Sequence, residues 1–200
     1  MRPVGQRLIN TPDIELWPGG LLRARGNHDA RLLSRATWVL RRKRDGRFLA
    51  ASLPDEGLVA MVPSLARESG LDEARAALAR QGPRPALGPS PTLPLSRLED
   101  RLAALGLDAD GYAARTGLPL VPEPVQLAFA GFDRFRRPLW LETNTARAWR
   151  QLRHAARRDG IVLEAISGYR SHDYQLGIFE RKLARGQTVD EILAVNAAPG

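Results

Sequence analysis

A proline-rich segment divides this sequence and limits the secondary structure that can cross it. Residues 81–94 read QGPRPALGPSPTLP. Proline lacks a backbone donor, breaks a helix interior and is confined to the edges of sheets. We therefore expect a semi-rigid linker at residues 81–94, between an accessory α+β domain of unknown role at residues 1–80 and a second domain at residues 95–200.

The composition is that of a folded protein, and it excludes several kinds of site. Of the 200 residues, 44% are hydrophobic and 26% are charged, which is a globular rather than a disordered balance. The chain contains no cysteine, which excludes disulfides, thiolate zinc sites, iron–sulfur clusters and a cysteine nucleophile.

The net charge of +8 comes almost entirely from arginine, since lysine occurs only at Lys43 and Lys182. Together with abundant Ala, Gly, Leu and Pro, this skew is typical of a GC-rich coding sequence, so the charge does not predict a nucleic-acid partner. No apolar run approaches the roughly 18 residues of a membrane span, and the N-terminus lacks the apolar run of an export signal. We expect no membrane span, and a cytoplasmic location on these grounds alone.

Local patterns predict an α+β fold in which helices pack on a small antiparallel sheet. Apolar runs at residues 36–42 and 47–52 flank Asp45-Gly46, a pair typical of a tight hairpin turn. Residues 125–129 and 138–142 predict a second hairpin. A buried or half-buried strand is also expected at residues 161–166, which form a short apolar run.

Helices are predicted from apolar spacing and from residues that cap helix ends. Before the linker, residues 71–78 have helical spacing. After it, we expect a helix at 96–106 with a Ser96/Glu99 capping box and a helix at 109–116 that stops at Gly117. Further helices are expected from Thr143 or Thr145 to Asp159, from Ser171 to Gly186, and from Thr188 to Val195 with a Thr188/Glu191 capping box.

Polar side chains gather where the predicted strand at 161–166 meets the helix that follows it. Arg170 lies at the strand end, and Gln175 lies in the first turns of the helix. A guanidinium can donate two parallel hydrogen bonds to a carboxylate, and a glutamine amide can both donate and accept. Arg170 and Gln175 could therefore converge on one ligand, although an arginine at a strand end more often pairs with a neighbouring acid than with a substrate.

Several pieces of the sequence from Leu118 to Gly200 resemble, in order, the VanY-type zinc D-alanyl-D-alanine carboxypeptidases. They are PLVPEPVQL, ARAWRQLRHAARRDGI, LEAISGYRS with the following Gln175, and GQTVDEILAVNAAPG. The resemblance covers roughly the last 80 residues and has no counterpart before the linker. It implies that residues 95–200 are the N-terminal part of a D,D-carboxypeptidase-like α+β domain.

The resemblance also implies roles for individual residues. In that family the arginine of SGYRS contacts the terminal carboxylate of the substrate and the later glutamine contacts the peptide, which assigns substrate binding to Arg170 and Gln175. Ser167, Tyr169 and Ser171 match the same motif as residues that shape the site. The implied partner is a peptidoglycan stem peptide, and the implied location is the cell envelope.

Zinc is implied only by the resemblance, because the family's metal motifs, Ser-x-His-x-x-Gly-x-Ala-x-Asp and Glu-x-x-His, do not occur in residues 1–200. Nor do His28, His154 and His172 have the close spacing of a zinc site built on one element. We expect no metal ligand and no catalytic residue in these 200 residues.

Two functions remain open from the sequence. The first is a peptidoglycan-peptide zinc carboxypeptidase that removes a terminal D-alanine, of which these residues are an inactive portion. The second is a non-catalytic module that binds peptidoglycan peptides or proteins. Neither the location nor the tetrapeptide or pentapeptide preference is decided by the residues.

Overall fold

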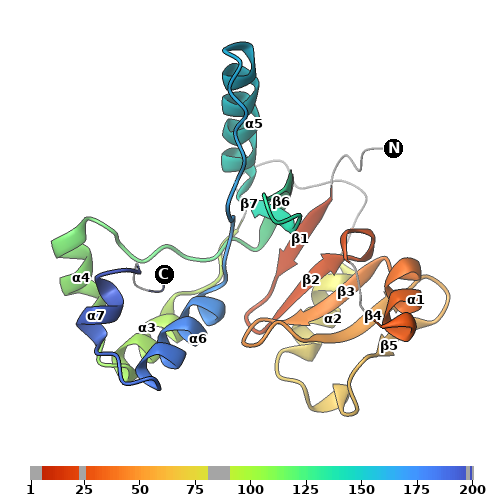
Figure 1. Ribbon diagram of the computed structural model, residues 1–200. Coiled ribbons are helices and arrows are strands. Elements are labelled where there is room, and N and C mark those ends of the chain that lie inside the picture. The colour runs from red at the N-terminus through yellow and green to blue at the C-terminus, as the bar shows by residue number, and fades with distance from the viewer. Residues whose placement is uncertain (1–5, 23–25, 81–90, 197–198, 200) are drawn as a thin grey trace. The chain divides into compact units, whose positions relative to one another are not determined.

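Two compact units make up the chain, and each is assembled from segments that are far apart in the sequence (Figure 1). The computed structural model describes residues 6–22, 26–80, 91–196 and 199. Unit 1 comprises Met1–Arg42, Gly46–Pro91 and Pro124–Tyr169, and unit 2 comprises Lys43–Asp45, Thr92–Glu123 and Arg170–Gly200. No helix in the described segments is both long and apolar enough to cross a membrane.

Unit 1 is built on a seven-stranded antiparallel sheet with the strand order β5-β4-β3-β2-β1-β6-β7. The strands are β1 (Arg7–Asn10), β2 (Ile14–Pro18), β3 (Trp38–Arg42), β4 (Phe48–Leu53), β5 (Gly57–Ala60), β6 (Gln126–Phe132) and β7 (Pro138–Leu141). Both predicted hairpins are confirmed, as β3–β4 and β6–β7. The chain is therefore α+β, as its sequence predicts.

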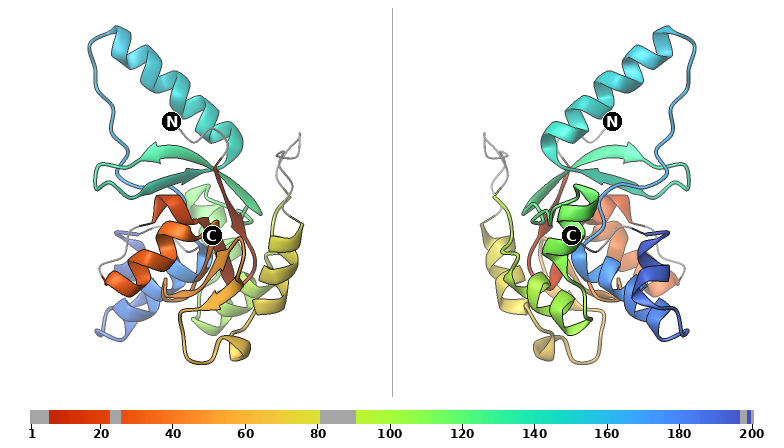
Figure 2. Two further views of the ribbon diagram at one scale, coloured as in Figure 1. Left: turned by 90° about the vertical axis from the view of Figure 1, so that its right-hand side faces the viewer. Right: turned by 90° about the vertical axis from the view of Figure 1, so that its left-hand side faces the viewer.

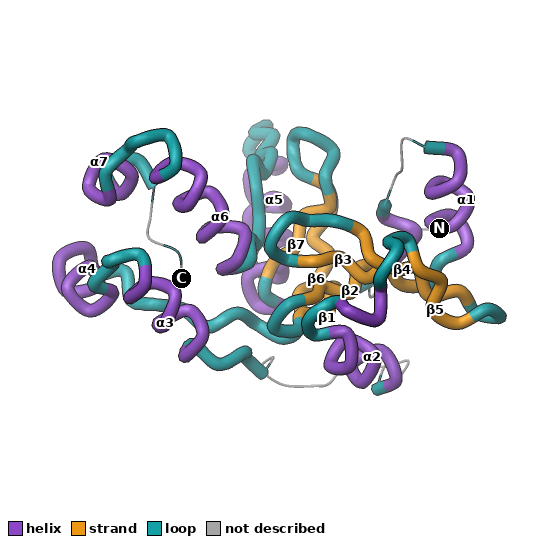
Figure 3. Tube along the Cα trace, turned by 90° about the horizontal axis from the view of Figure 1, so that it is seen from below, coloured by secondary structure: helices purple, strands orange, loops and turns teal. Residues whose placement is uncertain are grey.

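Helices cover both faces of the sheet between β2 and β5 (Figure 3). Successive side chains of a strand point to opposite faces, so apolar residues on both faces can be buried under a helix. On one face Leu40 packs in a core with α2 (Leu71–Ala79), which follows the short helix η2 (Leu65–Arg67). On the other face Val39 packs with Leu33 of α1 (Asn27–Arg35), which follows the short helix η1 (Gly19–Leu21). Adjacent residues of β3 thus serve two separate apolar cores.

The sheet draws strands from both sides of the predicted linker. β1 pairs with β6, and Leu8 packs in a buried cluster with Leu127 and Trp140. Residues 81–90 of the predicted linker lie outside the described residues. The predicted domains at residues 1–80 and 95–200 share this sheet, and their independence stays a prediction.

The long helix α5 (Thr143–Arg158) packs on the β6–β7 hairpin through its first turns only (Figure 2). Ala146 and Trp149 lie in a cluster with Leu139, whereas Leu152, one turn further on, is 54% exposed. The helix begins at the N-cap Glu142, whose carboxylate accepts hydrogen bonds from two backbone amides of the first turn. The expected cap at Thr143 or Thr145 was wrong, because this carboxylate already satisfies those amides.

The strand expected at residues 161–166 is absent, and the segment has no regular secondary structure. Ile161, Val162 and Ile166 are more than half exposed. The segment contacts the β6–β7 hairpin mainly at Ala165, whose carbonyl accepts a hydrogen bond from the backbone N–H of Arg134. The prediction of a buried or half-buried strand was wrong, because an apolar run becomes a strand only where a neighbouring strand pairs with it.

Unit 2 is helical and has a core of its own. Its helices are α3 (Ser96–Ala104), α4 (Ala109–Thr116), α6 (His172–Leu183) and α7 (Val189–Leu193). The buried side chains between them are Leu98, Leu102, Leu107, Leu176, Phe179 and Ile192. This core is separate from the cores of the sheet and holds the short helices together.

Three of the helix ends predicted in unit 2 are confirmed, and one predicted cap is not. Gly117 ends α4 at φ 70°, Ser171 caps α6, and a Thr188/Glu191 capping box opens α7, as expected. The Ser96/Glu99 capping box was wrong. Leu95 precedes α3 with helical backbone angles, so Ser96 already lies inside the first turn and makes no capping hydrogen bond.

The glycine of the SGYRS motif has a structural role that yields a prediction. A Cβ atom on Gly168 would lie 2.5 Å from the Trp140 carbonyl oxygen, which also accepts the backbone N–H of Tyr169. Gly168→Ala should therefore lower the free energy of unfolding by about 1 to 3 kcal/mol, the usual cost of overpacking. Gly20→Ala is the control, because a Cβ there meets nothing within 4 Å. Urea unfolding measures both, and equal stability of the two variants would contradict the close approach at Gly168.

Candidate peptide-binding site

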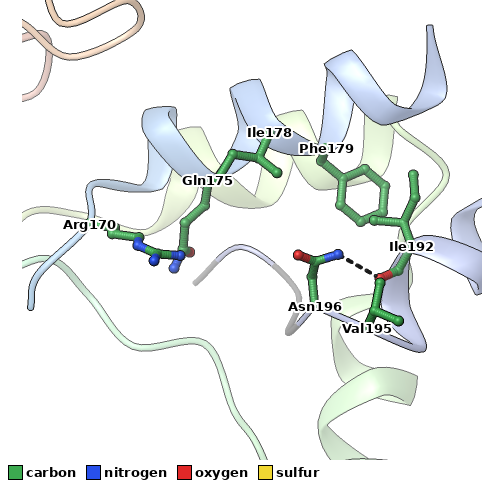
Figure 4. Close-up of a pocket in the computed structure, with 7 residues that line it drawn as sticks. All are labelled: Arg170, Gln175, Ile178, Phe179, Ile192, Val195 and Asn196. Atoms are coloured by element: carbon green, nitrogen blue, oxygen red, sulfur yellow. Dashed lines mark hydrogen bonds between the residues drawn. The ribbon is translucent and has the colours of Figure 1, made fainter. Parts of the chain in front are cut away.

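A cavity of about 270 Å³ lies in unit 2 beside α6 and α7 (Figure 4). Its lining residues come from the end of the SGYRS motif, from α6, and from α7 with the residues after it. They are Arg170, Gln175, Ile178, Phe179, Ile192, Val195 and Asn196. Pockets for drug-sized ligands measure about 300 to 1,000 Å³, so this cavity suits a smaller ligand such as the end of a peptide.

The start of α6 places Arg170 and Gln175 on the same side of the cavity. Ser171 is the N-cap, and its hydroxyl accepts a hydrogen bond from the backbone N–H of Tyr174. Arg170 therefore precedes the helix, and Gln175 lies one turn inside it. The two side chains run toward one another at the edge of the cavity (Figure 4). The guanidinium of Arg170 makes no ion pair with any described residue.

An apolar wall faces these polar groups. Ile178 and Phe179 follow Gln175 along α6 by about one turn, and Ile192 and Val195 come from the α7 region. Phe179 and Ile192 are buried, which anchors the wall in the core of unit 2. A small aliphatic side chain would find apolar partners here.

Asn196 supplies a polar group with a defined orientation. Its Nδ2 donates a hydrogen bond of 3.0 Å to the backbone carbonyl of Ile192. The side-chain carbonyl oxygen consequently points away from that hydrogen bond, into the space in front of Arg170 and Gln175 (Figure 4). An oxygen so placed can accept a hydrogen bond from the N–H of a ligand.

The cavity as a whole has the chemistry of a site for a carboxylate next to an amide. Arg170 offers a charged pair of donors, Gln175 offers a donor and an acceptor, and Asn196 offers an acceptor. No acid lines the cavity, so nothing in the wall competes for the guanidinium.

A buried charged cluster fixes the position of α6. Glu123 is 4% exposed and accepts hydrogen bonds from the ammonium of Lys43 and from the backbone N–H of His172, the first residue of α6. Lys43 is 2% exposed. The Nε2–H of His172 donates to the carbonyl of Val121, with 3.0 Å between the two atoms. The carboxylate thus takes up an amide that the helix leaves without an internal partner.

The same contacts set the charges of this cluster. Burial by itself raises the pKa of Glu123, but the charge of Lys43 and the hydrogen bonds from Lys43 and His172 outweigh it and lower that pKa overall. Burial lowers the pKa of His172, and the charge of Glu123 offsets only part of this effect. At neutral pH, Glu123 is therefore ionised and His172 is neutral.

A second set of ion pairs joins α3 to α6. Asp173, which is 7% exposed, accepts a hydrogen bond from Arg101. The other guanidinium nitrogen of Arg101 lies 2.9 Å from Glu180, two turns further along α6. One arginine therefore holds α6 at two points on its length.

The structure brings together some of the sequence-predicted residues and separates others. Arg170 and Gln175 line the cavity, and Ser171 is buried as the cap that starts α6. Tyr169 belongs to unit 1, where its hydroxyl accepts a hydrogen bond of 2.9 Å from Asn10, and Ser167 is exposed outside the cavity. Roles in substrate binding stay a prediction for all five.

The described residues do not fit a zinc ion. No group of three or more His, Asp or Glu side chains among them could hold a metal. His154 is exposed on α5, His172 is engaged with Val121, and the side chain of His28 lies outside the described residues. Arginine and amides line the cavity, and these are not zinc ligands.

Sequence reasoning missed Asn196, Glu123 and Lys43. Asn196 stands in the VNAAPG tail and Glu123 between two prolines in VPEPV, so both lay inside stretches already singled out. The only signal for Lys43 was its rarity, since it is one of two lysines among many arginines. Nothing in the local sequence connects it to Glu123, which lies 80 positions away.

Comparison with known proteins identifies the class to which the C-terminal part of the chain is related. Residues 138–200 match the model of a family described as D-alanyl-D-alanine carboxypeptidase. This family is VanY, and the match confirms the predicted resemblance over that range, which contains every residue that lines the cavity. The searches of curated proteins and of solved structures each gave no match.

The buried pair of Lys43 and Glu123 yields a prediction about stability. Glu123→Gln should cost about 3 to 5 kcal/mol, because it leaves the buried ammonium of Lys43 without its carboxylate. Lys43→Met combined with Glu123→Gln should recover most of that loss, because the double variant buries neither charge. Denaturant unfolding of the two single variants and the double variant completes the cycle. Losses that simply add would show that the two side chains do not interact.

Proposed function

We propose that the cavity of unit 2 binds the terminal D-alanine carboxylate of a peptidoglycan stem peptide. Arg170 holds the carboxylate, Gln175 and Asn196 hold the adjacent amide, and the apolar wall takes the methyl group of the terminal residue. In this proposal the site is the substrate-binding part of a zinc D-alanyl-D-alanine carboxypeptidase. The metal ligands of such an enzyme are not among the described residues.

The observation that carries this proposal is the state of Arg170. Arg170 is exposed, and its guanidinium has no ion pair with any described residue. It lies instead at the edge of a cavity with an amide beside it. A free guanidinium next to amide groups supports recognition of a carboxylate at the end of a peptide.

The dimensions and polarity of the cavity also support a short peptide terminus. A volume of about 270 Å³ suits the end of a short peptide. Ile178 and Val195 present aliphatic surface, which favours a methyl group over a charged or long polar one. The family match over residues 138–200 supports D-alanine as the terminal residue.

A second function, a non-catalytic peptide- or protein-binding module, is favoured by one observation. The described residues contain no cluster that could hold a metal ion. Such a module would keep the carboxylate-binding cavity and use it for recognition alone. The two functions therefore share the cavity and differ in whether D-alanine is released.

Substitution of Arg170 tests carboxylate recognition directly. Arg170→Lys should weaken binding of an acylated D-alanyl-D-alanine peptide by roughly ten- to a hundredfold, because a lysine cannot donate two parallel hydrogen bonds to one carboxylate. Arg170→Ala should weaken it further. Arg185→Lys is the control, because Arg185 is exposed beyond the end of α6 and does not line the cavity. Calorimetric titration of residues 1–200 measures each affinity.

A peptide amidated at its C-terminus completes this test. It should bind wild type weakly and lose little more in Arg170→Ala, because the two changes remove the same interaction. Independent, additive losses would show that Arg170 does not hold the terminal carboxylate.

Release of D-alanine distinguishes the two functions. Residues 1–200 should neither bind zinc stoichiometrically nor release D-alanine from a pentapeptide, because their described part holds no metal-ligand cluster. Elemental analysis and a D-alanine assay measure this. Turnover abolished by a chelator would contradict the expectation and would place a metal site within these residues.

A further inference from the structure

A second cavity, of about 550 Å³, lies in unit 1 at the turn between β6 and β7. One side is formed by the η1 region and the other by the hairpin. The lining residues are Gly20, Leu21, Leu22, Phe132, Arg136, Arg137 and Pro138. This volume falls within the roughly 300 to 1,000 Å³ of small-molecule sites.

The turn that forms one wall is held rigidly by a buried carboxylate. Asp133 is 8% exposed and accepts hydrogen bonds of 2.9 Å from the backbone N–H groups of Phe135 and Arg137. Its other oxygen accepts the Nε–H of Arg137 at 2.7 Å. Asp133 thus holds the backbone of the turn and the side chain of Arg137.

An aromatic series supports the apolar part of the wall. Phe132 is 54% exposed and meets Phe129 edge to face, with 5.3 Å between the ring centroids. Phe129 in turn meets the buried Trp140 at 5.7 Å. An exposed ring fixed in this way, together with Leu21 and Leu22, offers a preformed apolar surface.

Arg136 contributes a guanidinium that stabilises no other described part of the fold. It is the one non-glycine residue with a positive φ, 60°, in the described part of the chain. Glycine would adopt this conformation without strain, so an arginine here is held against its backbone preference. Its guanidinium makes no hydrogen bond or ion pair with any described residue, whereas that of Arg137 is engaged with Asp133 and with the carbonyl of Ile166.

We propose that this cavity binds an amphiphilic anion, an apolar chain that ends in a carboxylate or a phosphate. The chain lies against Leu21, Leu22 and Phe132, and the anionic group pairs with Arg136. Purely apolar ligands would leave the guanidinium of Arg136 unused, and purely anionic ones would leave the apolar wall in water. This site is separate from the cavity of unit 2 and does not depend on the function proposed for it.

Soluble probes of matched chain length test both halves of the proposal. Decanoate and decyl phosphate should bind residues 1–200, whereas decanol and inorganic phosphate should bind at least tenfold more weakly. Decanol binding as well as decanoate would reduce the site to an apolar groove. Inorganic phosphate binding as well as decyl phosphate would reduce it to an anion site, and binding to phosphatidylglycerol vesicles without binding to either soluble amphiphile would make it a membrane-docking surface. Each of these three results overturns the proposal.

Arg136→Gly separates binding from folding. It should weaken decanoate binding about tenfold or more and leave decanol binding unchanged, while thermal stability is maintained or raised because glycine relaxes the backbone. Arg134→Gln is the matched control, since Arg134 is exposed on the same turn and does not line the cavity. Equal loss in both variants would show that only the general positive charge of the turn matters, and unchanged decanoate binding in Arg136→Gly would remove Arg136 from the site.

Discussion

The arrangement of unit 2 depends on one buried carboxylate, that of Glu123. It accepts the first backbone N–H of α6 and the ammonium of Lys43, and all of these groups are largely removed from water. A buried charge is tolerated only when it is paired and hydrogen-bonded, so the start of α6 is confined to the place where Glu123 can reach it. Arg170 and Gln175 flank that start, and their positions at the cavity follow from it. Arg170 and Gln175 are therefore positioned by Glu123 and Lys43, which do not line the cavity.

The cavity beside α6 and the match to D-alanyl-D-alanine carboxypeptidases point to the same chemistry from independent directions. The match rests on the sequence of residues 138–200, whereas the cavity is defined by geometry and contains an arginine without an ion pair to any described residue. Such an arginine, two amides and an aliphatic wall together suit the end of a peptide that carries a small side chain. The described residues supply binding groups and no metal ligands. In the proposed function, recognition of the peptide end and its hydrolysis rest on different groups, so peptide binding can be tested with residues 1–200 alone.

The sequence predicted correctly those turns and helix ends that are formed by residues close to one another in the chain. The Asp45-Gly46 turn, the glycine stop after α4, the Ser171 cap and the Thr188/Glu191 capping box each involve neighbouring residues only, and each is confirmed. The signals failed where the cause lies elsewhere in the chain. Residues 161–166 have a strand-like pattern, but no described strand pairs with them. At the candidate site, Arg170 and Gln175 could be found from a motif. Glu123 and Lys43 could not, because only the folded chain brings them together.

Nuclear magnetic resonance of the side chains in the cavity tests the central claim most directly. With residues 1–200 labelled at nitrogen, titration with an acylated D-alanyl-D-alanine peptide should shift the Nε resonance of Arg170 and the side-chain amide resonances of Gln175 and Asn196, with one shared dissociation constant. The L-alanyl-L-alanine peptide should produce smaller shifts at the same groups, since its methyl groups cannot face the same wall. Binding that leaves these three side chains unshifted would place the peptide elsewhere on the molecule and contradict the account.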